Sequence, residues 1–407
     1  MAKGNLVVGQ GGGPTAVINS SLVGVIHEAM ANDIYASLGE RGPIGDIYGM
    51  VHGVEGFLQG DIIDLRKQSR SALETLRYTP ASALGTARYK PSKEEFVKVV
   101  EKLKAMKIRY FFYIGGNDSA SIVRGVNRAA KELDYNVYAI AVPKTVDNDL
   151  VGTDHCPGYG SGARFVAAAI RNTGRDTEAM GKYGPIRLME IMGRNAGWLT
   201  AATALAREEE RDAPHLVYVP ERPVTVEQVV EDVRRVYEKL GFCVAAISEG
   251  TVDPSGRSIG EDIAPKEVDG FGHVRKGGVT PFLSELINAK LGIRARLDNP
   301  YYLQRSFVEM ASPVDQDEAY RVGRQAVRAA LAGAKGVMIT LEREAGPEYY
   351  CSTGVVDVEK VADQESKMPA DMMNEAGNFP TQKFLNYARP LIGGPLPKLA
   401  RLEMIRV

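Results

Sequence analysis

Short runs of aliphatic and β-branched residues alternate along the chain with longer stretches in which apolar residues recur every three or four positions. The short runs predict buried strands, the longer stretches predict amphipathic helices, and their alternation is typical of a parallel sheet with crossover helices. The predicted strands cover residues 5–9, 110–114, 137–142, 186–191 and 242–247. The predicted helices run from the first glycines to about residue 30 and over about 92–106, 119–133, 195–208, 225–240 and 312–333.

The signals at the ends of these elements support the α/β interpretation. Ser92 and Glu95 have the spacing of a capping box, and Ser312-Pro313 is typical of a helix start. The segments 250–280 and 342–382 are richer in glycine, proline and charge, and predict loops or insertions. No linker divides the chain cleanly, so we expect two α/β halves that exchange terminal segments, with a boundary near residue 150.

Composition excludes several classes of protein. The 407 residues are 44% hydrophobic and carry 50 Lys and Arg against 51 Asp and Glu, values typical of a globular protein with no excess charge for nucleic acid or a membrane surface. The three cysteines lie far apart and indicate a reducing compartment. No apolar stretch is long enough to span a membrane. We therefore expect a cytoplasmic protein with no nucleic-acid or membrane partner.

Five predicted strands end directly in glycine-rich or polar motifs. Because ligands of open α/β sheets bind beyond the carboxyl ends of the strands, we expect these motifs to meet in one cleft. The five motifs are Gly11-Gly12-Gly13-Pro14-Thr15, Gly115-Gly116-Asn117-Asp118-Ser119, Pro143-Lys144-Thr145-Val146-Asp147-Asn148-Asp149, Met192-Gly193-Arg194 and Ser248-Glu249-Gly250.

Two of the motifs are suited to phosphate. Glycines between a strand and a helix let backbone N–H groups approach phosphate oxygens at the helix N-terminus, although a plain tight turn also uses glycines. In the second motif, Asn117 or Asp118 offers an oxygen ligand to a magnesium ion that is bound to the phosphate. The alternative for that motif is ordinary helix capping.

The third motif is the most specific local signal. Thr145, Asp147 and Asp149 alternate, so an extended loop directs their side chains to the same side. A carboxylate in this position accepts the proton of a hydroxyl that attacks phosphorus, and Lys144 supplies positive charge where negative charge is redistributed. A surface Asx-turn is the alternative, but it requires neither the lysine nor the second aspartate.

Further polar residues would complete a sugar-phosphate site. Arg194 is suited to bind a phosphate with two hydrogen bonds, and an ion pair at the sheet edge is its alternative role. Glu249 is suited to accept hydrogen bonds from sugar hydroxyls, and a cap at the strand end is its alternative role. Arg88 is another phosphate candidate. Three arginines also bracket further polar residues downstream, as either a phosphate pocket or a solvated face: Arg294, Arg296, Tyr301, Tyr302, Gln304 and Arg305.

In order and spacing, the motifs GGGPT, GGNDS, PKTVDND, MGR, SEG and YLQR resemble the 6-phosphofructokinase family over nearly the whole chain. The resemblance implies phosphoryl transfer to the 1-hydroxyl of fructose 6-phosphate, a step of glycolysis. It also implies two Rossmann-like three-layer α/β halves with mostly parallel sheets and the active site in the cleft between them. Residues 1–150 would bind the donor, 151–330 the sugar phosphate, and 331–407 would pack across both as strand and helix segments with insertions.

The resemblance also implies roles for single residues. Asp147 would be the general base, with Thr145 beside it and Lys144 at the transferred group. The donor would contact Gly11, Gly12, Gly13, Arg88, Gly116, Asp118 and Ser119, and Mg²⁺ would be held by Asn117 and Asp149. The sugar phosphate would contact Thr145, Asp147, Met192, Gly193, Arg194, Glu249, Arg296, Tyr302 and Arg305, some of these from a neighbouring subunit of a homodimer or homotetramer.

Two positions bear on the donor. ATP-using members of the family carry GGDGS and PGT, whereas pyrophosphate-using members carry GGDDS and PKT. Asp118 and Lys144 follow the second pattern, and a carboxylate at 118 would repel the α-phosphate of ATP. We therefore predict reversible, pyrophosphate-dependent formation of fructose 1,6-bisphosphate. An ATP-dependent enzyme or a related sugar-phosphate kinase is the alternative. Asn117, where the family usually has a magnesium-coordinating aspartate, would support a non-catalytic regulatory subunit instead.

Overall fold

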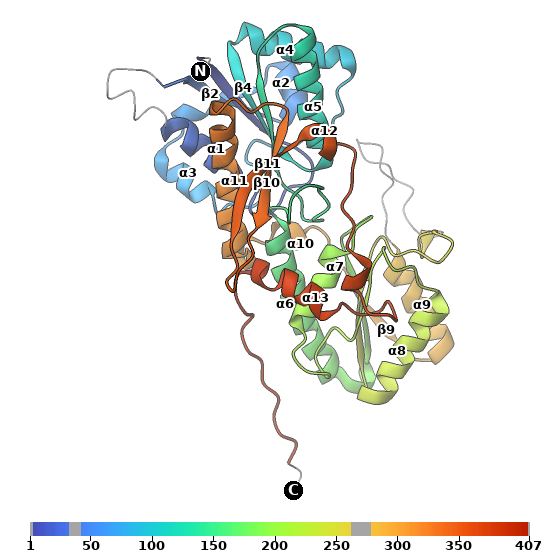
Figure 1. Cartoon of the computed structure of the whole chain (residues 1–407). Coiled ribbons are helices and arrows are strands. Elements are labelled where there is room, and N and C mark those ends of the chain that lie inside the picture. Colours follow the sequence, from blue (N-terminus) through green and yellow to red (C-terminus); the bar gives the residue numbers. More distant parts are fainter. Residues whose placement is uncertain (1–2, 32–41, 262–277, 406–407) are drawn as a thin grey trace.

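The computed structural model describes residues 3–31, 42–261 and 278–405. Within these ranges the strands form two sheets, each covered by helices on both faces, and the two halves lie one above the other in Figure 1. The predicted α/β class with two halves and mostly parallel sheets is therefore confirmed. No helix in the described ranges is long and apolar enough to cross a membrane.

The first half contains a sheet with the strand order β11-β10-β5-β4-β1-β2-β3. Its central strands are parallel, whereas the edge strands β11 and β3 run antiparallel to their neighbours. Its strands are β1 Gly4–Gln10, β2 Ile44–Met50, β3 Ile62–Asp64, β4 Ile108–Gly115, β5 Tyr138–Pro143, β10 Val337–Arg343 and β11 Cys351–Asp357.

Helices bury both faces of this sheet. Successive side chains of a strand point to opposite faces, so each strand contributes to two cores. In β1, Leu6 and Val8 pack into the core under α1, α3 and α11, whereas Val7 packs under α2, α4, α5 and α12. These helices are α1 Ile18–Ala31, α2 Gly53–Gln59, α3 Arg70–Leu76, α4 Lys93–Ala105, α5 Asn117–Glu132, α11 Pro313–Leu331 and α12 Val358–Val361.

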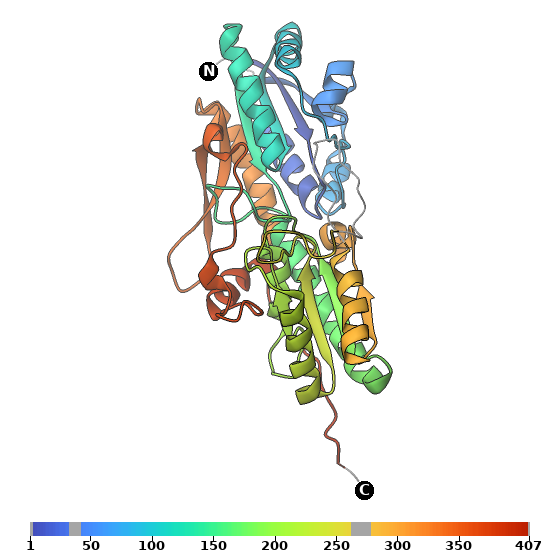
Figure 2. The same ribbon diagram turned by 90° about the vertical axis from the view of Figure 1, so that its right-hand side faces the viewer.

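Helix α11 returns the chain to the first half. It crosses α1 so closely that a Cβ on Gly24 would lie 2.3 Å from the Tyr320 carbonyl oxygen. The return thus begins before residue 331, and the three-part division at 150 and 330 otherwise stays a prediction. In Figure 2 the orange and red segments near the end of the chain lie along one side of both halves.

The second half contains a parallel sheet with the order β7-β8-β6-β9. In β8, Val244 and Ala246 face the core under α6, α7 and α13, while Ala245 and Ile247 face the core under α8 and α9. The strands are β6 Ile186–Ile191, β7 Leu216–Tyr218, β8 Cys243–Ser248 and β9 Ala295–Asp298, and the helices are α6 Tyr159–Met180, α7 Trp198–Ala202, α8 Val226–Leu240, α9 Val279–Leu291, α10 Leu303–Ser306 and α13 Gln382–Ala388. Short 3₁₀ turns complete the described chain at Leu65–Lys67, Gly181–Tyr183, Thr203–Ala206, Val308–Met310, Ala370–Met372 and Pro390–Ile392.

All five predicted strands are confirmed, and Ser92 and Glu95 form the expected capping box. The helical stretch predicted over about 195–208 is shorter in the structure and consists of α7 and the 3₁₀ turn Thr203–Ala206 that follows it. The loop prediction for 342–382 is wrong over 351–361, where β11 and α12 form. Only Cys351 of this edge strand is fully buried, so its small and polar residues resemble a loop in sequence. Residues 262–277 of the other predicted loop lie outside the described ranges.

Candidate active site

The five motifs follow strands that end level with one another. Gln10 of β1 is level with Ile114 of β4, and Gly115 with Pro143 of β5, so three motifs leave the same edge of the first sheet. In the second sheet Ile191 is level with Ser248, which places the other two motifs side by side. The strands therefore collect the predicted chemistry at two sheet edges.

The triple-glycine loop lies against two cations. The Lys144 ammonium donates a hydrogen bond to the Gly13 carbonyl oxygen at 2.6 Å. A Cβ added to Gly12 would lie 3.3 Å from the Lys144 Nζ, and one on Gly13 would lie 2.5 Å from the Arg305 guanidinium. Gly12 also has φ 73°, which favours glycine. Glycine thus admits Lys144 and Arg305 to this loop.

In the loop after β5, hydrogen bonds of Thr145 and Asn148 fix the backbone that carries Asp147 and Asp149. The Asp147 N–H donates to the Thr145 hydroxyl at 3.1 Å. Asn148, at φ 58°, is buried and is held by the Tyr387 hydroxyl at 2.8 Å and the Cys156 N–H at 2.9 Å. Asn148 therefore anchors the loop to the protein interior, between the partly exposed Asp147 and Asp149.

Charges of both signs share this poorly solvated region. Burial raises the pKa of Asp147, and the positive charges of Arg194, Lys144 and Arg305 act in the opposite direction. Burial, followed by repulsion from Asp147, raises the pKa of Asp149 to about 7. Burial, followed by Arg305, lowers the pKa of Lys144 to about 8. Groups from both halves of the molecule thus act on one another electrostatically, which indicates a common site.

The two motifs of the second half support each other. The Glu249 carboxylate accepts the Gly193 N–H at 3.3 Å, and the Ser248 hydroxyl donates to the Gly193 carbonyl at 2.7 Å. Burial, and then repulsion from Asp147, raises the pKa of Glu249 to about 7. The Met192 N–H donates at 3.0 Å to the side chain of Gln304, which is buried in α10. Gln304, which the sequence placed only within the downstream cluster, thus orients this loop through its buried amide.

The downstream arginines separate in the structure. Arg305 lies at the site, with its guanidinium 4.5 Å from the centre of the exposed Tyr302 ring. Arg296 is level with Arg187, near the start of β6, and donates to the Tyr183 carbonyl at 3.3 Å. A single chain therefore brings Arg305 to the motifs but leaves Arg296 toward the opposite end of β6.

The motif Gly115-Gly116-Asn117-Asp118-Ser119 leads into α5. Ser119 is buried where a Cβ on Gly115 would lie 1.9 Å from its hydroxyl oxygen, so the Gly115-Gly116 turn packs directly on this serine. Asp118 lines a cavity of about 400 Å³ between α4 and α5, together with Tyr89 and Phe96. Arg88 is near enough to lower the pKa of Lys144, as the weakest of five influences.

Residues 363–368, which we call the strap, contact the site without any sequence signal. The Asp363 N–H donates to the Asn117 side-chain oxygen at 2.7 Å. The Ser366 N–H donates to the Asp149 carbonyl at 2.7 Å, and Glu365 accepts two hydrogen bonds from Asn195 at 3.0 and 3.1 Å. The strap could not be found from the sequence because most of its attachments use its own backbone atoms.

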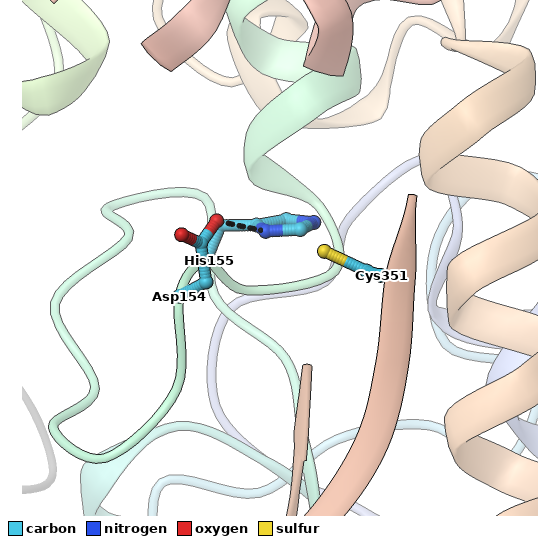
Figure 3. Close-up of side chains that lie close together, drawn as sticks. All are labelled: Asp154, His155 and Cys351. Carbon is cyan, nitrogen blue, oxygen red and sulfur yellow. Dashed lines mark hydrogen bonds and ion pairs between the residues drawn. The ribbon is translucent and has the colours of Figure 1, made fainter. Parts of the chain in front are cut away.

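A second polar cluster lies behind the loop after β5 and combines Asp154, His155 and Cys351 (Figure 3). The His155 ring bonds to Asp154 through Nδ1 at 2.8 Å and to Glu318 through Nε2 at 2.7 Å. Burial alone would lower the pKa of His155, but these two carboxylates raise it to about 9. A protonated ring with both nitrogens engaged cannot ligate a metal ion, so this cluster joins the loop to α11 by charge.

Replacing His155 with glutamine is expected to destabilise the protein by about 3–5 kcal/mol, because it breaks a buried ion pair. The pKa of His155 is raised on folding, so its contribution is complete below pH 6.5 and is lost as pH rises through about 9. Melting temperatures of both proteins between pH 6 and 9.5 check this. A gap between them that stays constant or widens toward pH 9.5 would contradict the assignment.

The chain belongs to the phosphofructokinase family, because the sequence profile of that family, described as Phosphofructokinase, matches residues 5–330. It is 41% identical to a pyrophosphate–fructose 6-phosphate 1-phosphotransferase of Rhodospirillum rubrum, covering 100% of this chain and 98% of the relative. It is 32% identical to a sulfofructose kinase of Alkalicoccus urumqiensis, over 90% and 91%. The crystal structure of a pyrophosphate-dependent phosphofructokinase from Marinobacter aquaeolei superposes with a TM-score of 0.86 at 35% identity, over 98% and 94%.

Proposed function

We propose that this chain is a phosphotransferase that moves a phosphoryl group reversibly from pyrophosphate to the 1-hydroxyl of fructose 6-phosphate, a step of glycolysis. Its relatives of known name support this function over the full length of the chain. The observation that carries the proposal is the position of Lys144, which bonds to the triple-glycine loop and acts electrostatically on Asp147. A cation and a base thus converge where a compact phosphate donor would meet a hydroxyl.

In this proposal Asp147 accepts the proton of the sugar 1-hydroxyl as that oxygen attacks phosphorus. The positive charges of Arg194, Lys144 and Arg305 favour the ionised form of Asp147, which is the form a base requires. Lys144 neutralises the phosphate that leaves, and the N–H groups of the glycine loops receive its oxygens. Glu249 and the loop Met192–Arg194 hold the sugar, with Arg305 and Tyr302 at its 6-phosphate.

Magnesium fits one side of this site better than the other. Asp149 offers carboxylate oxygens of the kind that Mg²⁺ prefers, beside Asp147. The side-chain oxygen of Asn117, in contrast, already accepts the Asp363 N–H. We therefore assign Asp149, rather than Asn117, as the main ligand of the magnesium ion. When bound, Mg²⁺ would neutralise charge on the phosphate that is transferred.

One observation keeps ATP as a second candidate donor. The cavity of about 400 Å³ beside Asp118 opens next to the second donor motif and has the aromatic rings of Tyr89 and Phe96 in its wall. Such a cavity is large enough for part of a nucleoside. The Asp118 carboxylate at its lining disfavours the polyphosphate that a nucleotide would bring with it.

The exposed Tyr302 and the remote Arg296 favour a pocket that a second copy of the chain completes, in a homodimer or homotetramer. The cysteines at 156, 243 and 351 are free and buried, which fits a reducing cytoplasm. The ligands in this proposal are pyrophosphate, Mg²⁺ and fructose 6-phosphate, with no membrane or nucleic-acid partner.

The test is a donor assay with the purified enzyme, fructose 6-phosphate and titrated magnesium, comparing pyrophosphate with ATP. We expect turnover with pyrophosphate and a kcat/KM for ATP that is lower by orders of magnitude. A preference for ATP would overturn the proposed donor. Binding of fructose 6-phosphate without turnover on either donor would favour a regulatory subunit instead. Sedoheptulose 7-phosphate as a second acceptor tests the choice of sugar.

A further inference from the structure

The strap, residues 363–368, crosses from the first half to the second over the candidate active site. In Figure 1 the chain after α12 descends from the upper half to the lower one. Three of the backbone N–H groups of the strap bond to three separate places: Asp363 to the donor motif, Ser366 to the catalytic loop and Met368 to Glu221 of the second half. The strap therefore joins elements that no single strand or helix connects.

The anchor at the donor motif is the side chain of Asn117. Its oxygen accepts the Asp363 N–H at 2.7 Å, and its amide nitrogen donates to the Gln364 carbonyl oxygen. Both partners are backbone atoms, one a donor and one an acceptor. Only an amide satisfies both, because a carboxylate has no N–H and would place a negative charge against the Gln364 carbonyl.

At its far end the strap reaches the residues that hold the sugar. Glu365 accepts both of its hydrogen bonds from Asn195, which directly follows Arg194. Beside it, the Ser366 carbonyl accepts the indole N–H of Trp198 at 3.4 Å. The Asp149 carbonyl is fixed between these contacts by the Ser366 N–H at 2.7 Å. A strap fastened at Asn117 thus restrains both Asp149 and the loop that carries Arg194.

We propose that Asn117 is a positioning residue that fastens the strap across the two halves of the active site, rather than a ligand of the magnesium ion. The kinetic consequence rests on the proposed function, but the attachment of the strap does not. This role gives a physical reason for an amide at the position where the family usually has an aspartate.

The test compares Asn117→Asp with Asn117→Ala by hydrogen exchange in the absence of substrates. With Asn117 as anchor, exchange of the Asp363 and Ser366 amides accelerates about tenfold in Asn117→Ala, which loses both hydrogen bonds, and by less in Asn117→Asp, which loses only the bond to Gln364; Met368, held by Glu221, changes little. Gln364→Ala is the matched control: Asn117 contacts only the backbone there, so exchange stays at the wild-type rate. Unchanged exchange in both Asn117 variants would overturn the proposal and show that Asp363 is held by Arg124 and Ser121 instead.

Kinetics separate anchoring from metal binding. For an anchor, Asn117→Asp lowers kcat about tenfold, leaves KM for fructose 6-phosphate within about twofold, and does not reduce the Mg²⁺ concentration needed for half-maximal rate. For a metal ligand, the added carboxylate would reduce that Mg²⁺ concentration and maintain or raise kcat, which would overturn the proposal. An enzyme that uses ATP instead of pyrophosphate would refute the proposed function and leave the exchange result intact.

Discussion

Replacement of Asp147 by asparagine is expected to lower turnover by about 10²–10⁴-fold while fructose 6-phosphate still binds, because a general base contributes about that much to the rate. The asparagine keeps the shape of the side chain and its backbone hydrogen bond to Thr145. It removes only the charge that accepts the proton. Initial rates with both substrates saturating, and fructose 6-phosphate binding by calorimetry, measure the two effects separately.

The control for this variant is Asp317→Asn, which alters an exposed carboxylate paired with Arg321 on α11. It should leave turnover unchanged within about twofold, since exposed ion pairs contribute little to the fold. If the affinity of Asp147→Asn for fructose 6-phosphate fell in parallel with turnover, Asp147 would be a sugar-binding residue and the base would have to be found elsewhere. Asp149, whose pKa burial raises to about 7, would then be the next candidate.

Local sequence patterns were sufficient to predict the central strands of both sheets. The run at 110–114 is entirely apolar or aromatic because β4 is buried on both faces, and such a run has few other structures open to it. The motifs at the strand ends could be predicted for the same reason, since a parallel sheet carries successive strand ends to one edge. Strand direction and burial therefore allowed the position of the candidate site to be predicted from the sequence.

What could not be predicted depends on contacts between residues that lie far apart in the sequence. Asn117 and Asp363 are 246 positions apart, and the partner of the Asn117 side chain is a peptide N–H that every residue except proline has. The backbone contacts of the strap therefore require no particular residue type at 363–368. His155 is similar, because one of the two carboxylates that raise its pKa belongs to Glu318 on α11, 163 positions away. Sequence reasoning from local patterns detects such a partner only when its residue type is specific to the contact.

The donor itself should depend on Lys144. Replacement by methionine, which is similar in length and uncharged, is expected to reduce kcat/KM for pyrophosphate by about 10²–10³-fold. The loss of one preorganised hydrogen-bond donor that stabilises charge in the transition state has an effect of this size. Two features support an effect of this size: the Lys144 ammonium is buried, and it lies against the phosphate-type glycine loop through its 2.6 Å bond to Gly13. Lys383→Met, at an exposed lysine paired with Asp371, is the matched control.

The same position should set the choice between donors when it is combined with Asp118. The double variant Asp118→Gly, Lys144→Gly removes the carboxylate beside the cavity and the ammonium beside the glycine loop. We expect it to lose turnover with pyrophosphate and to raise kcat/KM for ATP by about tenfold or more, because it relieves a repulsion and opens space at once.

For the single variant, full pyrophosphate activity in Lys144→Met would show that another group supplies the charge that neutralises the leaving phosphate. Arg305 is the alternative at the same loop.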